Sequence, residues 1–360
     1  MSNQMKAAGH VPLPRDIDMK LICIEEHAID PAIAHAAQLA LRKEAPYMTL
    51  QSSAAAASNP QLEDRPHLVE MSDAVALGTD LGAGRIAAMD MHGIDMQVVS
   101  YSTPVQLAPE DQAVRLAADA NDSLAWAISE NPTRLAGFAA LPWRSPLAAA
   151  EELERAVTEL GFKGALIMGR PFNDFLDNGH YAPVLQKLND LAVPLYVHPF
   201  YPVPAVHDAY YAGLKPEVSA QFSLGGWGWH HEAGIHVVRL ILAGIFERYP
   251  QLQVISGHWG EMVPYFLPRL NDSLPRSITG LSGTIGETYR AHVWVTPSGM
   301  YYPAHLDYIR SVVGLERVIW SVDYPYRTLH GTRKFMADVL EDGDERRRIS
   351  HSNAETLLRL

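Results

Sequence analysis

Residues 21–28 read Leu-Ile-Cys-Ile-Glu-Glu-His-Ala, an apolar run that ends abruptly in two carboxylates and an imidazole. The apolar part is typical of a buried β-strand that delivers polar side chains at its C-terminal end. Because side chains alternate across a strand, we expect Glu25 and His27 on one face and Glu26 on the other. Glu25 and His27 could then bind one divalent cation, whereas Glu26 is predicted to meet a charged partner on the outer face.

Length and charge narrow the class of protein. The 360 residues include 29 basic and 41 acidic side chains, a formal net charge of −12, without a block of like charges. This balance argues against nucleic-acid and anionic-membrane partners and favours a small-molecule substrate.

Cys23 is the only cysteine and lies in an apolar strand, so we interpret it as a core residue. The sequence has no signal-like or membrane-spanning apolar run, which predicts a soluble, cytoplasmic protein with a flexible arm over residues 1–18.

The chain repeats one unit, in which a short apolar run leads through a loop into an amphipathic helix. The runs predicted as strands are residues 21–28, 94–100, 135–141, 163–168, 193–199, 254–257, 293–296 and 318–322. The predicted helices are residues 31–42, 109–131, 145–161, 181–190, 231–249, 331–341 and 345–358. This alternation predicts a distorted (β/α)8 TIM barrel that forms a single domain over residues 1–360. A doubly wound open sheet is the alternative, but no glycine-rich phosphate motif follows the first strand.

Two segments interrupt the repeat. Residues 43–84 are rich in Ala, Ser and Pro, and residues 200–230 are rich in Pro, Gly and aromatic side chains. Both are predicted to be irregular insertions at the C-terminal face of the barrel, and the second is expected to lie over the site as a long loop.

Polar side chains follow several of the predicted strands. They are Glu25, His27, His198, His258 and Asp323. Barrel enzymes build their active sites at this end of the strands. A single strand-end histidine such as His198 is more often hydrogen-bonded than bound to metal. Two imidazoles together with two carboxylates, however, suit Zn²⁺ or Mn²⁺ and leave room for a water or substrate oxygen.

A second motif, Ser-Gly-His-Trp-Gly-Glu, covers residues 256–261. If a helix opens after its last glycine, Glu261 can hydrogen-bond His258 and fix the tautomer that a general acid or base needs. A first-turn glutamate favoured by the helix dipole explains Glu261 as well. His236 is predicted to pack within a helix. The sequence does not decide whether His230 or His231 caps that helix and which of them reaches the pocket.

The segments IEEHA, YVHP, GHWGE and SVDYP, together with GRIAAMDMHGID and HVVRLILAGIFERYP, resemble the amidohydrolase superfamily. Within it they are most similar to the nonoxidative aromatic acid decarboxylases, whose substrates include γ-resorcylate, 2,3-dihydroxybenzoate and 5-carboxyvanillate. The resemblance covers about residues 21–360. Hydrolases of the superfamily commonly begin with His-X-His, whereas this chain has Glu25 at the first position, as the decarboxylases do.

The resemblance implies roles for eight residues. The ligands of one divalent metal ion, Zn²⁺ or Mn²⁺, would be Glu25, His27, His198 and Asp323. The catalytic residues would be His258, Glu261 and Asp323, and the substrate-binding residues would be Arg85 and Arg269. The resemblance also suggests a homodimer or a homotetramer.

The implied reaction is the nonoxidative decarboxylation of an ortho-hydroxybenzoate to a phenol and CO₂. Direct loss of CO₂ would leave an aryl carbanion, so the ring carbon must first be protonated, and an ortho oxygen held at a metal makes this possible. The alternative is a metal-dependent hydrolase or hydratase that acts on a lactone, an amide or a double bond. A non-catalytic binding barrel is disfavoured by the intact set of ligands.

Overall fold

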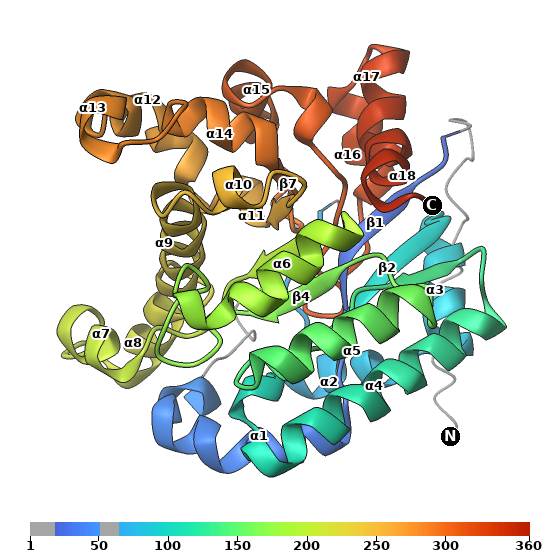
Figure 1. Ribbon diagram of the computed structural model, residues 1–360. Helices are drawn as coiled ribbons and strands as arrows, with labels where there is room; N and C mark the ends of the chain where they lie inside the picture. Colours follow the sequence, from blue (N-terminus) through green and yellow to red (C-terminus); the bar gives the residue numbers. More distant parts are fainter. Residues whose placement is uncertain (1–18, 51–64) are drawn as a thin grey trace, which may run out of the picture.

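Seven parallel strands form the wall of a barrel (Figure 1) in this computed structural model, which describes residues 19–50 and 65–360. The strands pair in the orders β1-β2-β3 and β4-β5-β6-β7. Their bounds are β1 Ile22–Ala28, β2 Met96–Tyr101, β3 Leu135–Gly137, β4 Ala165–Met168, β5 Leu195–His198, β6 Val254–Ser256 and β7 Val293–Val295.

Backbone pairing joins the two sheets into a closed ring. Ala139, just after β3, pairs in parallel with Ala165 of β4. On the other side Val318 pairs in parallel with Val295 of β7. The segment after Val318 then reaches β1, where the Ile24 N–H donates to the carbonyl of Trp320 at 2.9 Å. The predicted distorted (β/α)8 barrel is confirmed.

The eighth strand differs from the prediction over residues 318–322. Only Val318 forms a strand-like pair, and after it the segment keeps single backbone hydrogen bonds, from Ile319 to Val295 and from Ile24 to Trp320. The reason is that the N–H groups of Val322 and Tyr324 donate to the Glu26 carboxylate instead of to a neighbouring strand.

Helices form a layer around the strands, with α4, α5 and α6 in contact side by side (Figure 1). In the first half of the chain they are α1 Pro31–Glu44, α2 Met71–Thr79, α3 Ala83–His92, α4 Glu110–Glu130, α5 Pro146–Thr158, α6 Ala182–Leu191, α7 Pro204–Tyr210 and α8 Pro216–Ser223. In the second half they are α9 Gly228–Leu242, α10 Ile245–Arg248, α11 His258–Glu261, α12 Val263–Ser273, α13 Arg276–Thr279, α14 Ile285–His292, α15 Pro303–Val312, α16 Thr332–Val339, α17 Gly343–Arg347 and α18 Asn353–Leu358.

The two segments predicted as irregular insertions contain helices. Within residues 43–84 the structure has a short 3₁₀ helix, Pro46–Leu50, then α2 and the start of α3. Residues 51–64 and the predicted arm, residues 1–18, lie outside the described residues. Within residues 200–230 the structure has α7, α8 and the start of α9. The prolines that suggested a loop stand in the first turns of α7 and α8, where a missing N–H costs nothing.

The barrel interior is filled by an apolar cluster with a member from every strand. It includes Ile22, Ile24, Val98, Ala136, Leu166, Tyr196, Ile255, Trp294 and Ile319. A second cluster lies between strands and helices and contains Cys23. Cys23 is fully buried, and burial raises the pKa of its thiol, so its predicted place in the core is confirmed.

A β-bulge breaks the side-chain alternation of β1 at Glu25. The register with β2 shifts between Ile24 and Glu26, and Glu25 has a φ of 81°. Strict alternation would put Glu25 on the opposite face from Ile24, which fills the barrel interior. The extra residue lets Glu25 and His27 both face the mouth of the barrel above Ile24.

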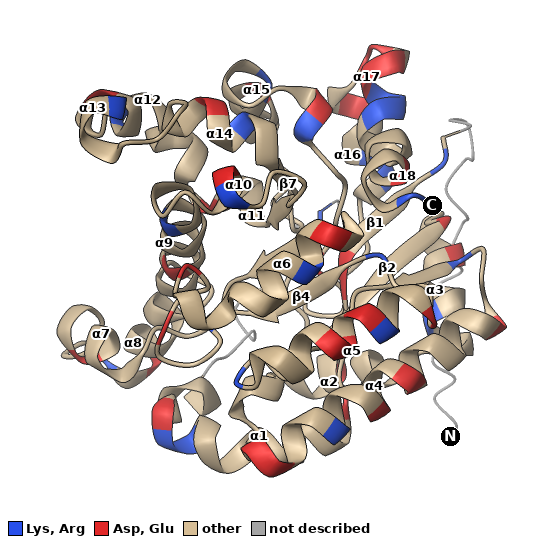
Figure 2. Cartoon of the chain, viewed as in Figure 1, with Lys and Arg blue, Asp and Glu red and all other residues tan. Residues whose placement is uncertain are grey.

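Acidic and basic side chains are interspersed on the outer helices (Figure 2). Arg155 of α5 is an example, because it pairs with Glu152 on its own helix and with Asp122 of α4 at 2.7 Å. Among the described helices, none combines the length and the apolar character that crossing a bilayer requires.

Candidate metal and catalytic site

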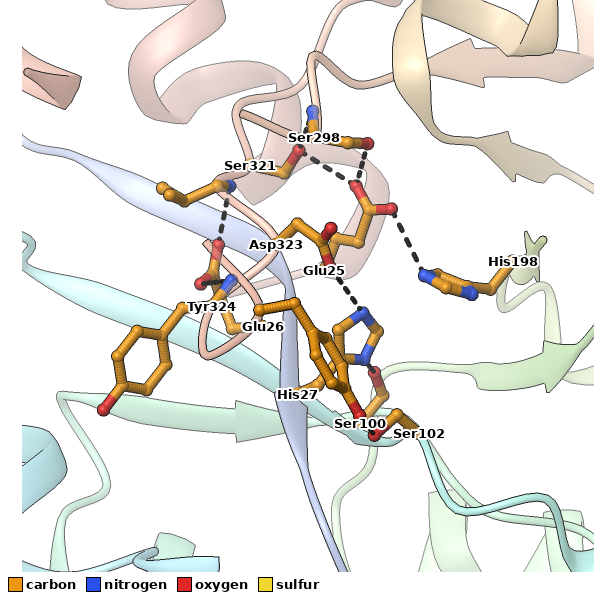
Figure 3. A network of polar contacts seen from close by, with 12 residues as sticks. Glu25, Glu26, His27, Ser100, Ser102, His198, Ser298, Ser321, Asp323 and Tyr324 are labelled. Carbon is orange, nitrogen blue, oxygen red and sulfur yellow. Dashed lines mark hydrogen bonds and ion pairs between the residues drawn. The ribbon is translucent and has the colours of Figure 1, made fainter. Parts of the chain in front are cut away.

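Four polar side chains point toward one another at the C-terminal end of the barrel (Figure 3). One ligand atom from each of Glu25, His27, His198 and Asp323 lies within 4.8 Å of the others. His27 Nε2 is 3.3 Å from Asp323 Oδ1, and His198 Nε2 is 3.7 Å from Glu25 Oε1. These four atoms are buried and have no hydrogen-bond partner among the described residues. Because unpaired buried polar atoms are costly, the cluster fits one divalent cation in both its donor types and its geometry.

The two imidazoles of this cluster are oriented by their other ring nitrogens. His198 Nδ1 lies 2.7 Å from the carbonyl of Pro199, and His27 Nδ1 lies 3.3 Å from Ser100 Oγ. An Nδ1–H that donates to a carbonyl leaves the Nε2 lone pair of His198 directed into the cluster. Burial, assisted by His27, lowers the pKa of His198, so its imidazole is neutral and suited to metal binding.

Hydroxyl groups hold Glu25 so that one oxygen stays free. Glu25 Oε2 accepts hydrogen bonds from Thr296 at 2.9 Å, from Ser321 at 3.1 Å and from the Ser298 hydroxyl. Burial raises the pKa of Glu25, and its attraction to His258 opposes that rise. With Oε2 occupied, Oε1 alone faces the cluster.

Glu26 fixes the backbone on both sides of Asp323. Its Oε1 accepts from the Val322 N–H at 2.9 Å, and its Oε2 accepts from the Tyr324 N–H at 3.2 Å. Glu26 is fully buried in the barrel wall. Arg85 supplies the predicted charged partner, because its charge favours ionised Glu26 and Gln97 bridges the two side chains. The structure adds that two backbone N–H groups without a strand neighbour bind the carboxylate oxygens.

The motif after β6 forms a left-handed turn. Residues 258–262, which include α11, all have positive φ, between 47° and 86°. The right-handed helix expected after Gly260 begins only at Val263. The turn brings His258 Nδ1 to 2.7 Å from Glu261 Oε1, which is the predicted contact reached by a different backbone path. A left-handed turn costs about 1–2 kcal/mol per non-glycine residue, and such strain collects at active sites.

The pair of His258 and Glu261 is ionised in the metal-free protein. Burial works to lower the pKa of His258, but Glu261, and then Glu25 and Asp323, raise it to about 9. Burial likewise works to raise the pKa of Glu261, but His258 and His230 bring it below its ordinary value. His258 therefore carries a proton that it can donate.

The structure decides between the two histidines that begin α9. His230 Nδ1 lies 2.8 Å from Glu261 Oε2, and its ring centroid is 4.3 Å from that of His258. His231 is exposed. His236 is buried, as predicted, and its Nε2 accepts the Leu176 N–H at 3.2 Å. Nothing in the sequence indicated that the second oxygen of Glu261 would form a hydrogen bond with another imidazole.

Neither of the two predicted substrate arginines hydrogen-bonds the free ligand atoms. Arg85 is 1% exposed and donates to the carbonyl of His27 at 2.6 Å, to Gln97 Oε1 at 3.0 Å and to the carbonyl of Asp80 at 3.0 Å. These contacts use all three guanidinium nitrogens, so they give Arg85 a supporting role for β1. Arg269 is exposed on α12, and its substrate role stays a prediction.

A shallow depression, open to solvent, lies beside the ends of β4 and β5. Its lining includes Leu107, Phe172, Phe200 and Arg170. Phe172 and Phe200 of its lining follow β4 and β5, so it lies at the C-terminal end of these strands, as the cluster does.

Comparison with known proteins agrees with this geometry. Residues 59–360 match the model of the Amidohydrolase family. The chain belongs to this family. Decarboxylase orsB of Emericella nidulans is 36% identical over 289 residues, which cover 78% of this chain and 86% of the relative. The γ-resorcylate decarboxylase of Rhodococcus jostii is 33% identical over 301 residues, which cover 78% and 88% of the two chains.

A solved structure of the same family shows a metal. The dihydroxybenzoic acid decarboxylase of a Polaromonas species, with bound manganese and the inhibitor 2-nitroresorcinol, superimposes with a TM-score of 0.78 at 28% identity. The match covers 95% of this chain and 97% of that chain. The predicted membership in the amidohydrolase superfamily, and in its aromatic acid decarboxylase group, is confirmed.

Proposed function

We propose that this protein is a divalent-metal-dependent carboxy-lyase that converts an ortho-hydroxybenzoate into a phenol and CO₂. One observation carries the proposal: four orphaned ligand atoms at the barrel mouth are accompanied by His258, whose Nδ1 lies 2.7 Å from Glu261 Oε1. The family relatives named as decarboxylases support the same reaction type.

The proposed metal ligands are Glu25, His27, His198 and Asp323, and they would hold one Mn²⁺ or Zn²⁺ ion. When bound, such an ion supplies positive charge for the substrate carboxylate and its ortho oxygen. Glu25 presents one oxygen because the hydroxyl groups of Thr296, Ser298 and Ser321 occupy the other.

The protein must supply one proton per turnover. We assign its delivery, to the ring carbon that bears the carboxylate, to Asp323 or to the acid formed by His258 and Glu261. Once that carbon is protonated, the electron pair of the breaking C–C bond returns to the ring, aromaticity is restored and CO₂ departs. The atoms and electrons of this reaction balance without a redox cofactor.

The test compares ortho- and para-hydroxybenzoates that carry the same further substituents, with Mn²⁺ and Zn²⁺ supplied separately. We expect CO₂ release from the ortho isomer only, because the para isomer cannot present a carboxylate and a neighbouring oxygen together. In heavy water the product should carry deuterium where the carboxylate stood. Equal turnover of both isomers would contradict the proposal. Rapid hydrolysis of a lactone or amide without CO₂ release would instead favour the hydrolase or hydratase.

We further propose that the chain is one amidohydrolase-type domain, with insertions over residues 43–84 and 200–230, that works as a cytoplasmic homodimer or homotetramer in the breakdown of aromatic compounds. Its partner would be a small aromatic carboxylate, and neither nucleic acid nor membrane would bind. Tyr265 and Phe266 of α12 and Ile278 of α13 are 69%, 51% and 67% exposed, which supports contact between copies. Light scattering during gel filtration tests the oligomeric state, and a monomer at micromolar concentration would contradict it.

A further inference from the structure

Glu261 is one carboxylate shared by two imidazoles. Its Oε1 is 2.7 Å from His258 Nδ1 and its Oε2 is 2.8 Å from His230 Nδ1. The Glu261 side chain is fully buried, whereas those of His258 and His230 are 7% and 16% exposed. Both oxygens of this carboxylate therefore depend on histidine donors.

An ionised Glu261 carboxylate can only accept a hydrogen bond, so the His230 Nδ1 that faces it is the protonated nitrogen. The His230 Nε2 lies 3.0 Å from the indole N–H of Trp229 and 3.1 Å from the carbonyl of Gly225. In the neutral ring, Nε2 accepts from Trp229 and the proton is on Nδ1. In the doubly protonated ring, Nε2 donates to Gly225 and Nδ1 again has its proton. Either way, Nδ1–H donates to Glu261 without any turn of the ring.

Among the described residues, the donors to the Glu261 carboxylate are the side chains of His258 and His230, not backbone N–H groups. Glu261 belongs to the left-handed turn, with a φ of 52°, and the following Met262 has a φ of 67°. If His230 were absent, Glu261 Oε2 would be a buried oxygen without its donor, a state that costs about 1–3 kcal/mol or more for a charged group. The carboxylate would then rotate or take up a proton, and either change removes it from His258.

We propose that His230 is a positioning residue that holds Glu261, and through it His258, in the geometry that the reaction requires, with Trp229 fixing the tautomer of His230. The proposal rests on the proposed decarboxylation for its catalytic consequence. The hydrogen bond between His258 and Glu261 is nevertheless observable without turnover. The positioning role of His230 and the proposed decarboxylation can therefore fail separately.

The experiment compares His230→Leu with His230→Asn, using His231→Asn as the matched control on the exposed side of the same helix. The Asn side-chain N–H₂ can take the place of the imidazole Nδ1–H, but it cannot act as an acid or base, whereas Leu has no donor. A displacement on the order of 1 Å can cost about 10²-fold in rate, so we expect kcat of His230→Leu to fall about 10- to 100-fold. KM and bound metal should stay near their wild-type values, and His230→Asn should recover most of kcat.

A spectroscopic measurement accompanies the kinetics. In zinc-loaded or metal-free protein, the His258 Nδ1–H proton should resonate far downfield because it is held by a carboxylate. That resonance should be lost in His230→Leu and present in His230→Asn and His231→Asn. Unchanged kcat and resonance in His230→Leu would overturn the proposal. So would equal loss of activity in both His230 variants with the resonance retained. If His230→Leu does not fold, Trp229→Phe decides, because without the indole N–H the His230 ring can place its proton on Nε2, toward the Gly225 carbonyl. We then expect a weakened His258 resonance and a lower kcat, and wild-type values of both would overturn the proposal.

If wild-type protein releases no CO₂ from any ortho-hydroxybenzoate, the proposed function fails, and the resonance alone then tests the role of His230.

Discussion

Glu26 holds the residues on both sides of Asp323, with one carboxylate oxygen on the Val322 N–H and the other on the Tyr324 N–H. Asp323 itself has a φ of 72°, a conformation that non-glycine residues rarely adopt. The ligand-bearing segment is therefore held by a residue next to two other ligands in β1. This relationship links metal binding to the integrity of the barrel wall.

Replacing Glu26 with Gln should weaken metal binding. A Gln side chain offers one acceptor oxygen, so one of the two N–H groups would face an amide N–H₂, at a cost of about 1–3 kcal/mol in unfolding free energy. Metal affinity should fall about 10- to 100-fold, as for other residues that orient ligands. Calorimetric titration of metal-free protein measures the affinity.

Glu152→Gln is the control for that variant, because Glu152 is also a buried carboxylate but pairs with Arg155 on the outer helices. It should lower stability and leave metal affinity unchanged. Equal metal affinity in Glu26→Gln and wild type would contradict the role assigned to Glu26.

Asp323→Asn should abolish decarboxylation. The change removes a negative ligand and a candidate proton donor, while the side-chain volume stays nearly the same. We expect kcat to fall by far more than tenfold, measured as CO₂ release with metal in excess. Activity within tenfold of wild type would remove Asp323 from the catalytic assignment.

His258→Asn should lower kcat on the order of 10²-fold or more, as expected for a positioned acid. Bound metal should remain near one ion per chain, because His258 interacts with Glu261 and not with the four orphaned atoms. Metal analysis and kinetics on the same preparation give both values. Parallel loss of metal and activity would make His258 a ligand.

The stability of the metal-free protein should depend on the protonation of His258. Its pKa is about 9 in the folded chain, above the ordinary value near 6.5 of an unfolded chain. Protonation therefore stabilises the fold fully below about pH 6.5, and this contribution is lost as the pH rises through 9. The difference in unfolding free energy between wild type and His258→Asn, measured in urea with EDTA, should shrink from pH 6 to pH 10. A difference that is constant over this range would show that His258 is not held protonated.

Much of the site could be predicted because residue types that bind metals stand at the ends of predicted strands. Glu25, His27, His198 and Asp323 each follow an apolar run, and parallel strands of a barrel bring their C-terminal ends to one face. The contact between His258 and Glu261 was also predicted, although the expected right-handed helix is a left-handed turn.

Other features could not be predicted from local pattern. The outer-face position of Glu26 was predicted, but its bonds to the N–H groups of Val322 and Tyr324 were not, because alternation says nothing about partners almost 300 positions away. Residues 204–223 were expected to be a loop, since prolines in first turns of short helices have the same composition as a loop. The hydrogen bond between His230 and Glu261 depends on how α9 packs against the turn after β6, which the local sequence does not specify.

The sequence by itself therefore determined the barrel and the chemical types of its ligands, because burial of apolar strands and the hardness of carboxylate and imidazole donors are local properties. Only the tertiary structure decided how those ligands are aimed. The bulge at Glu25 and the positive φ angles of Glu25, His258 and Asp323 are unfavourable locally. They persist because distant groups, the Thr296 hydroxyl for Glu25, the Glu26 carboxylate for Asp323 and His230 for the turn, hold them in place.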